Sequence, residues 1–137
     1  MVTETAAKPA SSPLARLVVD ASAISAIFFR EPKAEFLERK LSKRSWVAPA
    51  LIDYEIGSVY LKKIKAYPHL RRQLDECYRI YCESVFERID VPISSVVEIA
   101  EKYSLTIYDA SYFWLAISLS LDLVTLDERL TAAWLKR

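Results

Sequence analysis

The sequence predicts an α/β fold in which helices flank a mainly parallel sheet. Short apolar runs typical of strands alternate along the chain with longer helical patterns, and this alternation favours parallel pairing. A hydrophobic content of 53% in 137 residues supplies one core, and the chain shows no internal repeat. We therefore expect a single domain over residues 15–137, preceded by a flexible tail over residues 1–14.

Four short runs are the predicted strands of this sheet. Residues 17–19 form a continuous apolar run, as in a strand that is buried on both faces. The other three predicted strands lie at residues 46–47, 89–91 and 123–125.

Proline residues set the boundaries of the first helices. The first helix stops before Pro32, a long helix starts at Pro49, where proline suits the first turn, and Pro68 breaks it. The expected helices cover residues 22–29, residues 33–41, residue 49 to the break at 68, and from there to about 87.

Capping-box spacing, with a Ser or Thr three positions before an acidic residue, marks the starts of the remaining helices. The pairs are Ser95 with Glu98, Thr106 with Asp109, and Thr125 with Glu128. The first of these helices is expected to reach Tyr103, and the last contains Leu130 and Trp134.

Composition excludes several classes of protein. No apolar run approaches the ~20 residues that cross a bilayer, and residues 1–13 lack the features of a secretion signal. We therefore expect a cytoplasmic protein with no membrane partner. Gly57 is the single glycine, so no glycine-rich phosphate loop can form and no nucleotide cofactor is expected. A lone His69 and the spacing of Cys77 and Cys82 argue against a zinc site or a redox pair.

Four acidic residues, far apart in the sequence, fall where their side chains can reach one site. Asp20 and Asp127 follow strand-like runs, at the ends where open α/β sheets assemble their sites. Glu55 lies within the long helix, and Asp109 opens a later one. Carboxylates without histidine are the expected ligands of Mg²⁺ or Mn²⁺, which indicates metal-dependent chemistry on phosphate esters.

Each acidic residue also has a structural explanation. The three aspartates fall near helix starts, where a carboxylate stabilises the helix by ~0.5–2 kcal/mol. Glu55 shares its helix face with Leu51 and Val59, so a buried ion pair is the alternative to a bound cation. Ser22 and Thr125 can support the carboxylates by hydrogen bonds, or simply cap helices. Taken together, the repulsion among four carboxylates favours a shared cation.

Basic residues gather near the end of the long helix and the turn that follows it. They are Lys62, Lys63, Lys65, Arg71 and Arg72. The net charge is only +1, so no overall basic field attracts nucleic acid. This cluster is either a solvated face or a set of phosphate contacts.

Four segments occur in the order and spacing of a known family. They are VVDASAISAIFFREP, VAPALIDYEIGSVYLK, LTIYDASYFWLA and LVTLDERL. Over residues 16–135 the chain resembles the PIN-domain ribonucleases, and among them the VapC-like toxins of type II toxin–antitoxin pairs. The resemblance implies a three-layer α/β/α fold around a parallel sheet. Many relatives add an edge strand beyond the position of Trp134, so we expect four or five strands.

The resemblance also implies an acidic pocket that binds Mg²⁺ or Mn²⁺ and hydrolyses RNA. By position, the acidic quartet of the family corresponds to Asp20, Glu55, Asp109 and Asp127, the last acting through water. Ser22 corresponds to the small hydroxyl residue beside the first aspartate. Ser58 stands where relatives often carry Asn, which is a departure from the family pattern.

Partners are implied as well: an RNA substrate, a second copy of the chain in a homodimer, and a small antitoxin protein that inserts into the active-site groove. The expected function is thus that of a metal-dependent endoribonuclease that acts as a toxin. The alternatives are a non-catalytic RNA-binding or scaffold protein on the same fold, and a housekeeping RNA-processing nuclease without an antitoxin. An aspartyl-phosphate phosphatase is set aside, because the segment at Asp20 lacks the second aspartate of its DxD pattern.

Overall fold

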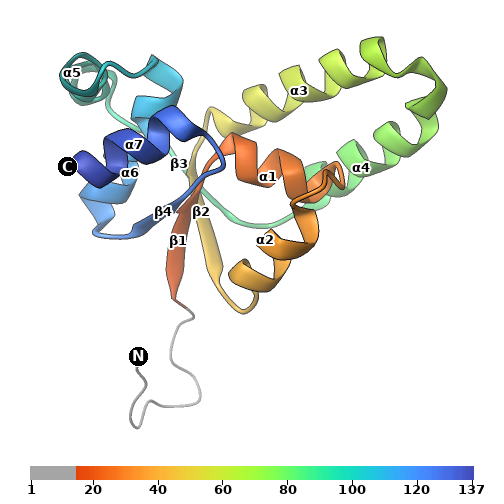
Figure 1. The fold of residues 1–137 in the computed structure, drawn as a ribbon, viewed down its shortest axis with the longest axis horizontal. Helices are drawn as coiled ribbons and strands as arrows, with labels where there is room; N and C mark the ends of the chain where they lie inside the picture. The colour runs from red at the N-terminus through yellow and green to blue at the C-terminus, as the bar shows by residue number, and fades with distance from the viewer. Residues whose placement is uncertain (1–14) are drawn as a thin grey trace, which may run out of the picture.

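A four-stranded parallel sheet of order β3-β2-β1-β4 forms the centre of the computed structural model, which describes residues 15–137 (Figure 1). Its strands are β1 (Arg16–Val19), β2 (Ser45–Pro49), β3 (Glu87–Ile89) and β4 (Asp122–Val124). In β1, Leu17 lies opposite Trp46 of β2 on one side and Asp122 of β4 on the other. The predicted parallel sheet is confirmed with four strands, while the predicted tail over residues 1–14 lies outside the described residues.

Helices cover both faces of this sheet. They are α1 (Ala21–Phe28), α2 (Ala34–Leu41), α3 (Ile52–Ala66), α4 (Arg71–Glu83), α5 (Ile93–Tyr103), α6 (Ile107–Leu119) and α7 (Glu128–Lys136), with a short 3₁₀ turn at Pro68–Leu70. Figure 1 shows α1 and α2 on one side of the sheet and α6 and α7 on the other, which confirms the three-layer α/β/α fold. The pair formed by α3 and α4 extends beyond the sheet (Figure 1). Within residues 15–137, no helix combines the length and apolar character needed to cross a membrane.

The core forms where the apolar strand residues meet the inner faces of the helices. Val18 and Val19 of β1 are completely buried, as expected for a strand that is covered on both faces. Ile24 of α1 and Ile52 and Ile56 of α3 are buried in the same core. Burial of such side chains contributes about 1.5–3 kcal/mol each, so this packing fixes the helix that carries Glu55 against the sheet.

Boundaries around β2 and β3 differ from the prediction. Pro49 ends β2 instead of starting α3, because the ladder to β3 continues beyond it: the Ala50 N–H donates to the Ile89 carbonyl oxygen at 2.8 Å. Since β2 pairs with residues 87–89, β3 begins earlier than predicted, and α4 accordingly ends at Glu83.

One of the three predicted capping pairs, at α6, is confirmed. Thr106 accepts a hydrogen bond from the Asp109 N–H at 3.1 Å and so caps α6. The prediction for α7 is wrong, because Asp127 is its N-cap. The Thr125 hydroxyl instead accepts from the Asp127 N–H, which lies before the first helical residue, and donates to Asp20.

The predicted cap of α5 is also wrong. This helix begins at Ile93, directly after Pro92, and no side chain caps it. Proline has no N–H of its own, so this helix start leaves one donor fewer to satisfy. Ser95 therefore lies inside the first turn rather than before it.

Candidate active site

Asp20 lies at the carboxyl end of β1, where the strand passes into α1. Its backbone N–H donates to the Val124 carbonyl oxygen at 3.0 Å, which joins it to β4. Its Oδ1 accepts a hydrogen bond from the Ala23 N–H at 3.0 Å, so it also caps α1. The residue is only 3% exposed. Asp20 therefore acts as a helix cap, and it also lies at the edge of the sheet where a site is expected.

Two hydroxyl groups hold the Asp20 carboxylate. Ser22 donates to Oδ1 at 2.7 Å, and Thr125 donates to Oδ2 at 2.5 Å. The loop between β4 and α7 is bound to the same two hydroxyls. The Leu126 N–H donates to Ser22 Oγ and the Asp127 N–H donates to Thr125 Oγ1, each at 2.9 Å. Both residues predicted to support the carboxylates thus contact Asp20 and fix it relative to the loop that carries Asp127.

Glu55 is held by a neutral donor near the start of α3. The Tyr112 hydroxyl, from α6, donates to Glu55 Oε1 at 2.6 Å. Within residues 15–137 no Lys or Arg forms an ion pair with Glu55, so the buried ion pair considered from the sequence is absent there. Burial raises the pKa of the Tyr112 hydroxyl, so it remains a donor. Tyr112 was not predicted from the sequence. The signal for it was a hydroxyl group within an apolar helix, three residues after Asp109, because a buried hydroxyl needs a hydrogen-bond partner.

The remaining two acids stand at the starts of helices on the other face of the sheet. Asp109 lies in the first turn of α6 and is half-buried. Asp127 caps α7, with its Oδ1 accepting a hydrogen bond from the Leu130 N–H at 2.8 Å, and it is also half-buried. Each of the four acids therefore reaches this edge of the sheet from a different element.

Burial and mutual repulsion both act on these carboxyl groups. Burial raises the pKa of Asp20 to about 6 against the lowering effect of its hydrogen bonds, and the charge of Asp109 adds to the rise. Burial also raises the pKa of Glu55, with further contributions from the charges of Asp109 and Asp20. The pKa of Asp109 is raised by burial and then by Asp127. Electrostatic repulsion therefore couples Asp20, Glu55 and Asp109 to one another and Asp109 to Asp127.

The donor set fits a hard divalent cation in its chemistry. It consists of carboxylate oxygens supported by hydroxyls, with neither histidine nor thiol, and such sets favour Mg²⁺ or Mn²⁺. Across residues 15–137, however, no three Asp, Glu, His or Cys side chains are already close enough together to hold one ion. Direct binding of one ion by three of these acids would therefore require some of their side chains to change position.

A cleft of about 660 Å³ opens beside Glu55, whereas Asp20, Asp109 and Asp127 do not line it. Ser22 and Glu55 form part of its wall, as does Ser58, the position where relatives often carry Asn. Tyr54 and Tyr108 also line the cleft and are 84% and 58% exposed. The side of the site that carries Glu55 is thus open to a ligand of the size of a nucleotide.

The predicted basic cluster does not surround this cleft as a group. Lys62 lines the cleft, but the other four residues do not. The Lys63 Nζ forms an ion pair with Glu31 Oε2 at 2.9 Å, and the Arg71 guanidinium pairs with Asp75 at 2.9 Å. The remaining two, Lys65 and Arg72, are exposed on α3 and α4.

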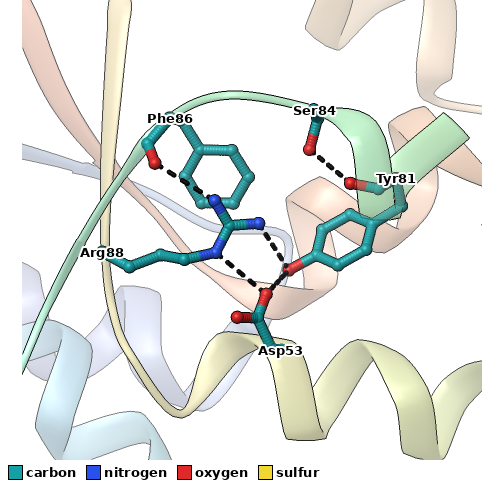
Figure 2. A network of polar contacts seen from close by, with 5 residues as sticks. All are labelled: Asp53, Tyr81, Ser84, Phe86 and Arg88. Carbon is teal, nitrogen blue, oxygen red and sulfur yellow. Dashed lines mark hydrogen bonds and ion pairs between the residues drawn. The ribbon is translucent and has the colours of Figure 1, made fainter.

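A second polar network anchors the start of α3 (Figure 2). Arg88 of β3 donates from Nε to Asp53 Oδ1 at 2.9 Å, and the Tyr81 hydroxyl donates to the same oxygen at 2.6 Å. The Arg88 guanidinium also donates to the Phe86 carbonyl oxygen at 3.1 Å and lies 3.9 Å from the centre of the Phe86 ring. Through Asp53, two residues before Glu55, this network joins α3 to α4 and β3. It therefore limits movement of the backbone at Glu55.

Comparison with known proteins places this architecture in a family. The family model of the PIN domain matches residues 17–133. Ribonuclease VapC3 of Pyrobaculum aerophilum is 32% identical over 126 residues, which cover 84% of this chain and 92% of that protein. The crystal structure of PAE2754 from the same organism has a TM-score of 0.60 at 28% identity, covering 88% of this chain and 86% of that one. The family match spans the parallel sheet and all four acids, and the chain belongs to the PIN-domain family.

Proposed function

We propose that the chain is a metal-dependent endoribonuclease that hydrolyses RNA phosphodiester bonds as the toxin of a toxin–antitoxin pair. The observation that carries this proposal is the set of four carboxylates, brought from four elements to one edge of the sheet, whose charges repel one another. Among residues 15–137, none of the four forms an ion pair with Lys or Arg. Similarity to ribonuclease VapC3 supports RNA as the substrate.

Asp20, Glu55 and Asp109 would hold Mg²⁺ or Mn²⁺, with Asp127 acting through a water molecule. When bound, the cation offsets charge on the phosphate and lowers the pKa of a water. The chain's own residues prepare this site. Ser22 and Thr125 fix both oxygens of Asp20, while Tyr112 engages only Oε1 of Glu55 and leaves Oε2 available.

The cleft supplies the approach for the phosphodiester. Ser22 and Glu55 line it, so an RNA strand lying in the cleft places a phosphate next to the Glu55 carboxylate. The carboxylates then orient the attacking water in line with the bond that breaks. Lys62, at the same cleft, is positioned to contact a neighbouring phosphate.

The proposal extends to the partners and the setting of the protein. We place it in the cytoplasm as a single domain over residues 15–137 that forms a homodimer and is inhibited by a small antitoxin protein inserted into the cleft. These points rest on the resemblance to VapC-like toxins. Light scattering on the purified protein checks for the dimer, and co-expression with the product of an adjacent small gene checks for inhibition.

The activity is tested by incubating the purified protein with a cellular RNA pool, with Mn²⁺ or with EDTA, beside the Asp109→Asn variant. The proposal predicts discrete fragments only for the unaltered protein with Mn²⁺, because the variant lacks one charged ligand. Mapping the fragment ends identifies the target. Binding of RNA without any cleavage would support the non-catalytic scaffold instead, and cleavage by the protein in EDTA would contradict the metal-dependent proposal.

A further inference from the structure

We propose that the cleft lined by Glu55 binds one unpaired base of the RNA, which stacks on the rings of Tyr54 and Tyr108. This inference rests on the proposed function, since it states how the RNA strand is held. It assigns a role in binding the RNA base to two residues that are not among the proposed metal ligands.

Both rings are exposed in a way that packing does not explain. Tyr54 is 84% exposed and Tyr108 is 58% exposed, whereas Tyr81 and Tyr112 in the core are 2% and 1% exposed. Neither exposed ring stacks on another aromatic ring within residues 15–137. Leaving such rings in water forgoes burial of their apolar faces, which a stacked base would recover.

Their position connects the two rings to the acidic site. Tyr54 directly precedes Glu55 in α3, and Tyr108 directly precedes Asp109 in α6. Both tyrosines line the same cleft as Glu55. A base that stacks on these rings is therefore held in the same cleft as the Glu55 carboxylate, which places its own phosphate near that acid.

The other walls of the cleft suit a base and its backbone. Leu51, Val59 and Leu126 contribute apolar surface, and the volume of about 660 Å³ lies within the range of small-ligand sites. Lys62 adds a positive charge on the same face of α3. In a duplex the bases are stacked within the helix and cannot enter such a cleft, so the geometry favours unpaired RNA.

Binding is measured by fluorescence anisotropy in EDTA, where cleavage is not expected to interfere. The probes are a fluorescein-labelled 12-nucleotide oligoadenylate RNA and a blunt 20-base-pair RNA duplex. Without metal, the acids repel the RNA equally in the unaltered protein and in every tyrosine variant. The readout is therefore the Kd of each variant divided by the Kd of the unaltered protein. Tyr54→Ala and Tyr108→Ala should each weaken oligoadenylate binding by about ten-fold, since one stacking contact is lost.

Matched variants separate stacking from other effects. Tyr54→Phe and Tyr108→Phe keep the ring and should bind like the unaltered protein. Tyr67→Ala removes a tyrosine that is 49% exposed at the end of α3 but does not line the cleft, and it should change nothing. Lys62→Ala should reduce the slope of log Kd against log salt concentration by about 1, the value for one lost phosphate contact. Lys65→Ala should leave this slope unchanged.

The outcomes distinguish this inference from the proposed function. Tyrosine-dependent binding of oligoadenylate with cleavage in Mn²⁺ supports both, and the same binding without cleavage supports the base site but not the nuclease. Unchanged Kd values in both alanine variants, or tighter binding of the duplex than of oligoadenylate, would overturn the base site. Cleavage of RNA in that case would leave the proposed function standing.

Discussion

The buried carboxyl group of Asp20 contributes more to the site than to the stability of the fold. Removal of a carboxylate from water is costly, and the three hydrogen bonds that it accepts offset only part of that cost. Its pKa accordingly rises from 3.8 to about 6. A residue that served only to cap α1 could remain partly exposed to solvent. The burial of Asp20 therefore indicates a functional role for a carboxylate that is held in a fixed position.

The stability of the metal-free protein should therefore fall as pH rises. Because the folded-state pKa exceeds 3.8, protonated Asp20 stabilises the fold fully below pH 3.8, and this contribution is lost as pH rises through about 6. The loss amounts to about 3 kcal/mol. Urea unfolding in EDTA between pH 4 and pH 8 measures it, and Asp20→Asn should lack this part of the pH dependence. Parallel curves for the two proteins would contradict the assignment.

Removal of the Tyr112 hydroxyl should shift the pH dependence of catalysis. Its hydrogen bond lowers the pKa of Glu55, so Tyr112→Phe should raise that pKa further. If cleavage needs ionised Glu55, the loss of activity on lowering the pH should then begin at a higher pH in Tyr112→Phe than in the unaltered protein. Cleavage rates from pH 5 to pH 9 at saturating Mn²⁺ test this, with Tyr103→Phe as the control. An unchanged profile in Tyr112→Phe would mean that the bond is only structural.

The sequence revealed the acids of this site more readily than their supports. Asp20 was predicted because it follows a strand-like run, at the end where open α/β sheets assemble their sites, and its contacts with Ser22 and Thr125 are confirmed. The partner of Glu55 was not predicted, because Tyr112 lies 57 residues away and meets it only when α6 packs near α3. Contacts of that range depend on the tertiary arrangement, which local patterns do not encode.

At the scale of the elements, α3 depends on the Arg88 network for its position. Arg88→Ala removes the bonds to Asp53 and Phe86 and the contact with the aromatic rings, and should destabilise the fold by about 1–2 kcal/mol. Arg79→Ala is the matched control, since it breaks two exposed ion pairs of α4 and should cost less than about 1 kcal/mol. Urea unfolding compares the two variants. Equal losses would contradict the anchoring role of Arg88.

Gly57 offers a stabilising change within the same helix. Its φ is not positive, and a Cβ placed there would meet only the Tyr78 hydroxyl oxygen, at 3.8 Å. Gly57→Ala should therefore raise the free energy of unfolding by about 0.5–1 kcal/mol through better helix propensity. Thermal unfolding measures the gain. A lower melting temperature would mean that α3 and α4 need closer contact than the structure has.

Element boundaries were predictable where a local signal acts without competition. Pro68 ends α3 as expected, and Thr106 caps α6 because no other group within residues 15–137 engages its hydroxyl. Thr125 has the same sequence spacing but serves Asp20 instead. Pro49 remains in β2 because the ladder to β3 runs past it. In both failures a contact distant in sequence outweighed a local preference.

At the scale of the whole molecule, the parallel sheet is what gathers four acids that are up to 107 positions apart in the sequence. Parallel strands end at one edge, so residues that follow β1 and β4 become neighbours, and α3 and α6 bring the other two acids to them. Alternation of strands and helices was enough to predict the sheet and the positions of Asp20 and Asp127 after its strands, whereas Glu55 and Asp109 were predicted from their helices and from the family resemblance. The spacing among the carboxylates was not predictable, because it depends on side-chain rotamers that a cation would change.

Metal binding should therefore stabilise the whole fold. Relief of the repulsion among the acids should raise the melting temperature by about 5 °C or more when Mn²⁺ exceeds its Kd by about 100-fold, and EDTA should reverse the rise. Asp20→Asn should respond much less. Differential scanning fluorimetry with and without Mn²⁺ provides the measurement, and an equal response of both proteins would place the metal elsewhere.

The most direct test of the account is cleavage of one RNA substrate across a Mn²⁺ titration by five variants. Four of them change the acids of the site: Asp20→Asn, Glu55→Gln, Asp109→Asn and Asp127→Asn. The fifth, Asp122→Asn, alters an exposed aspartate at the opposite end of β4. We predict that the first three lose more than about 100-fold in rate, that Asp127→Asn loses less, and that Asp122→Asn is unaffected. Full activity of Asp20→Asn at the same Mn²⁺ concentration as the unaltered protein would contradict the account.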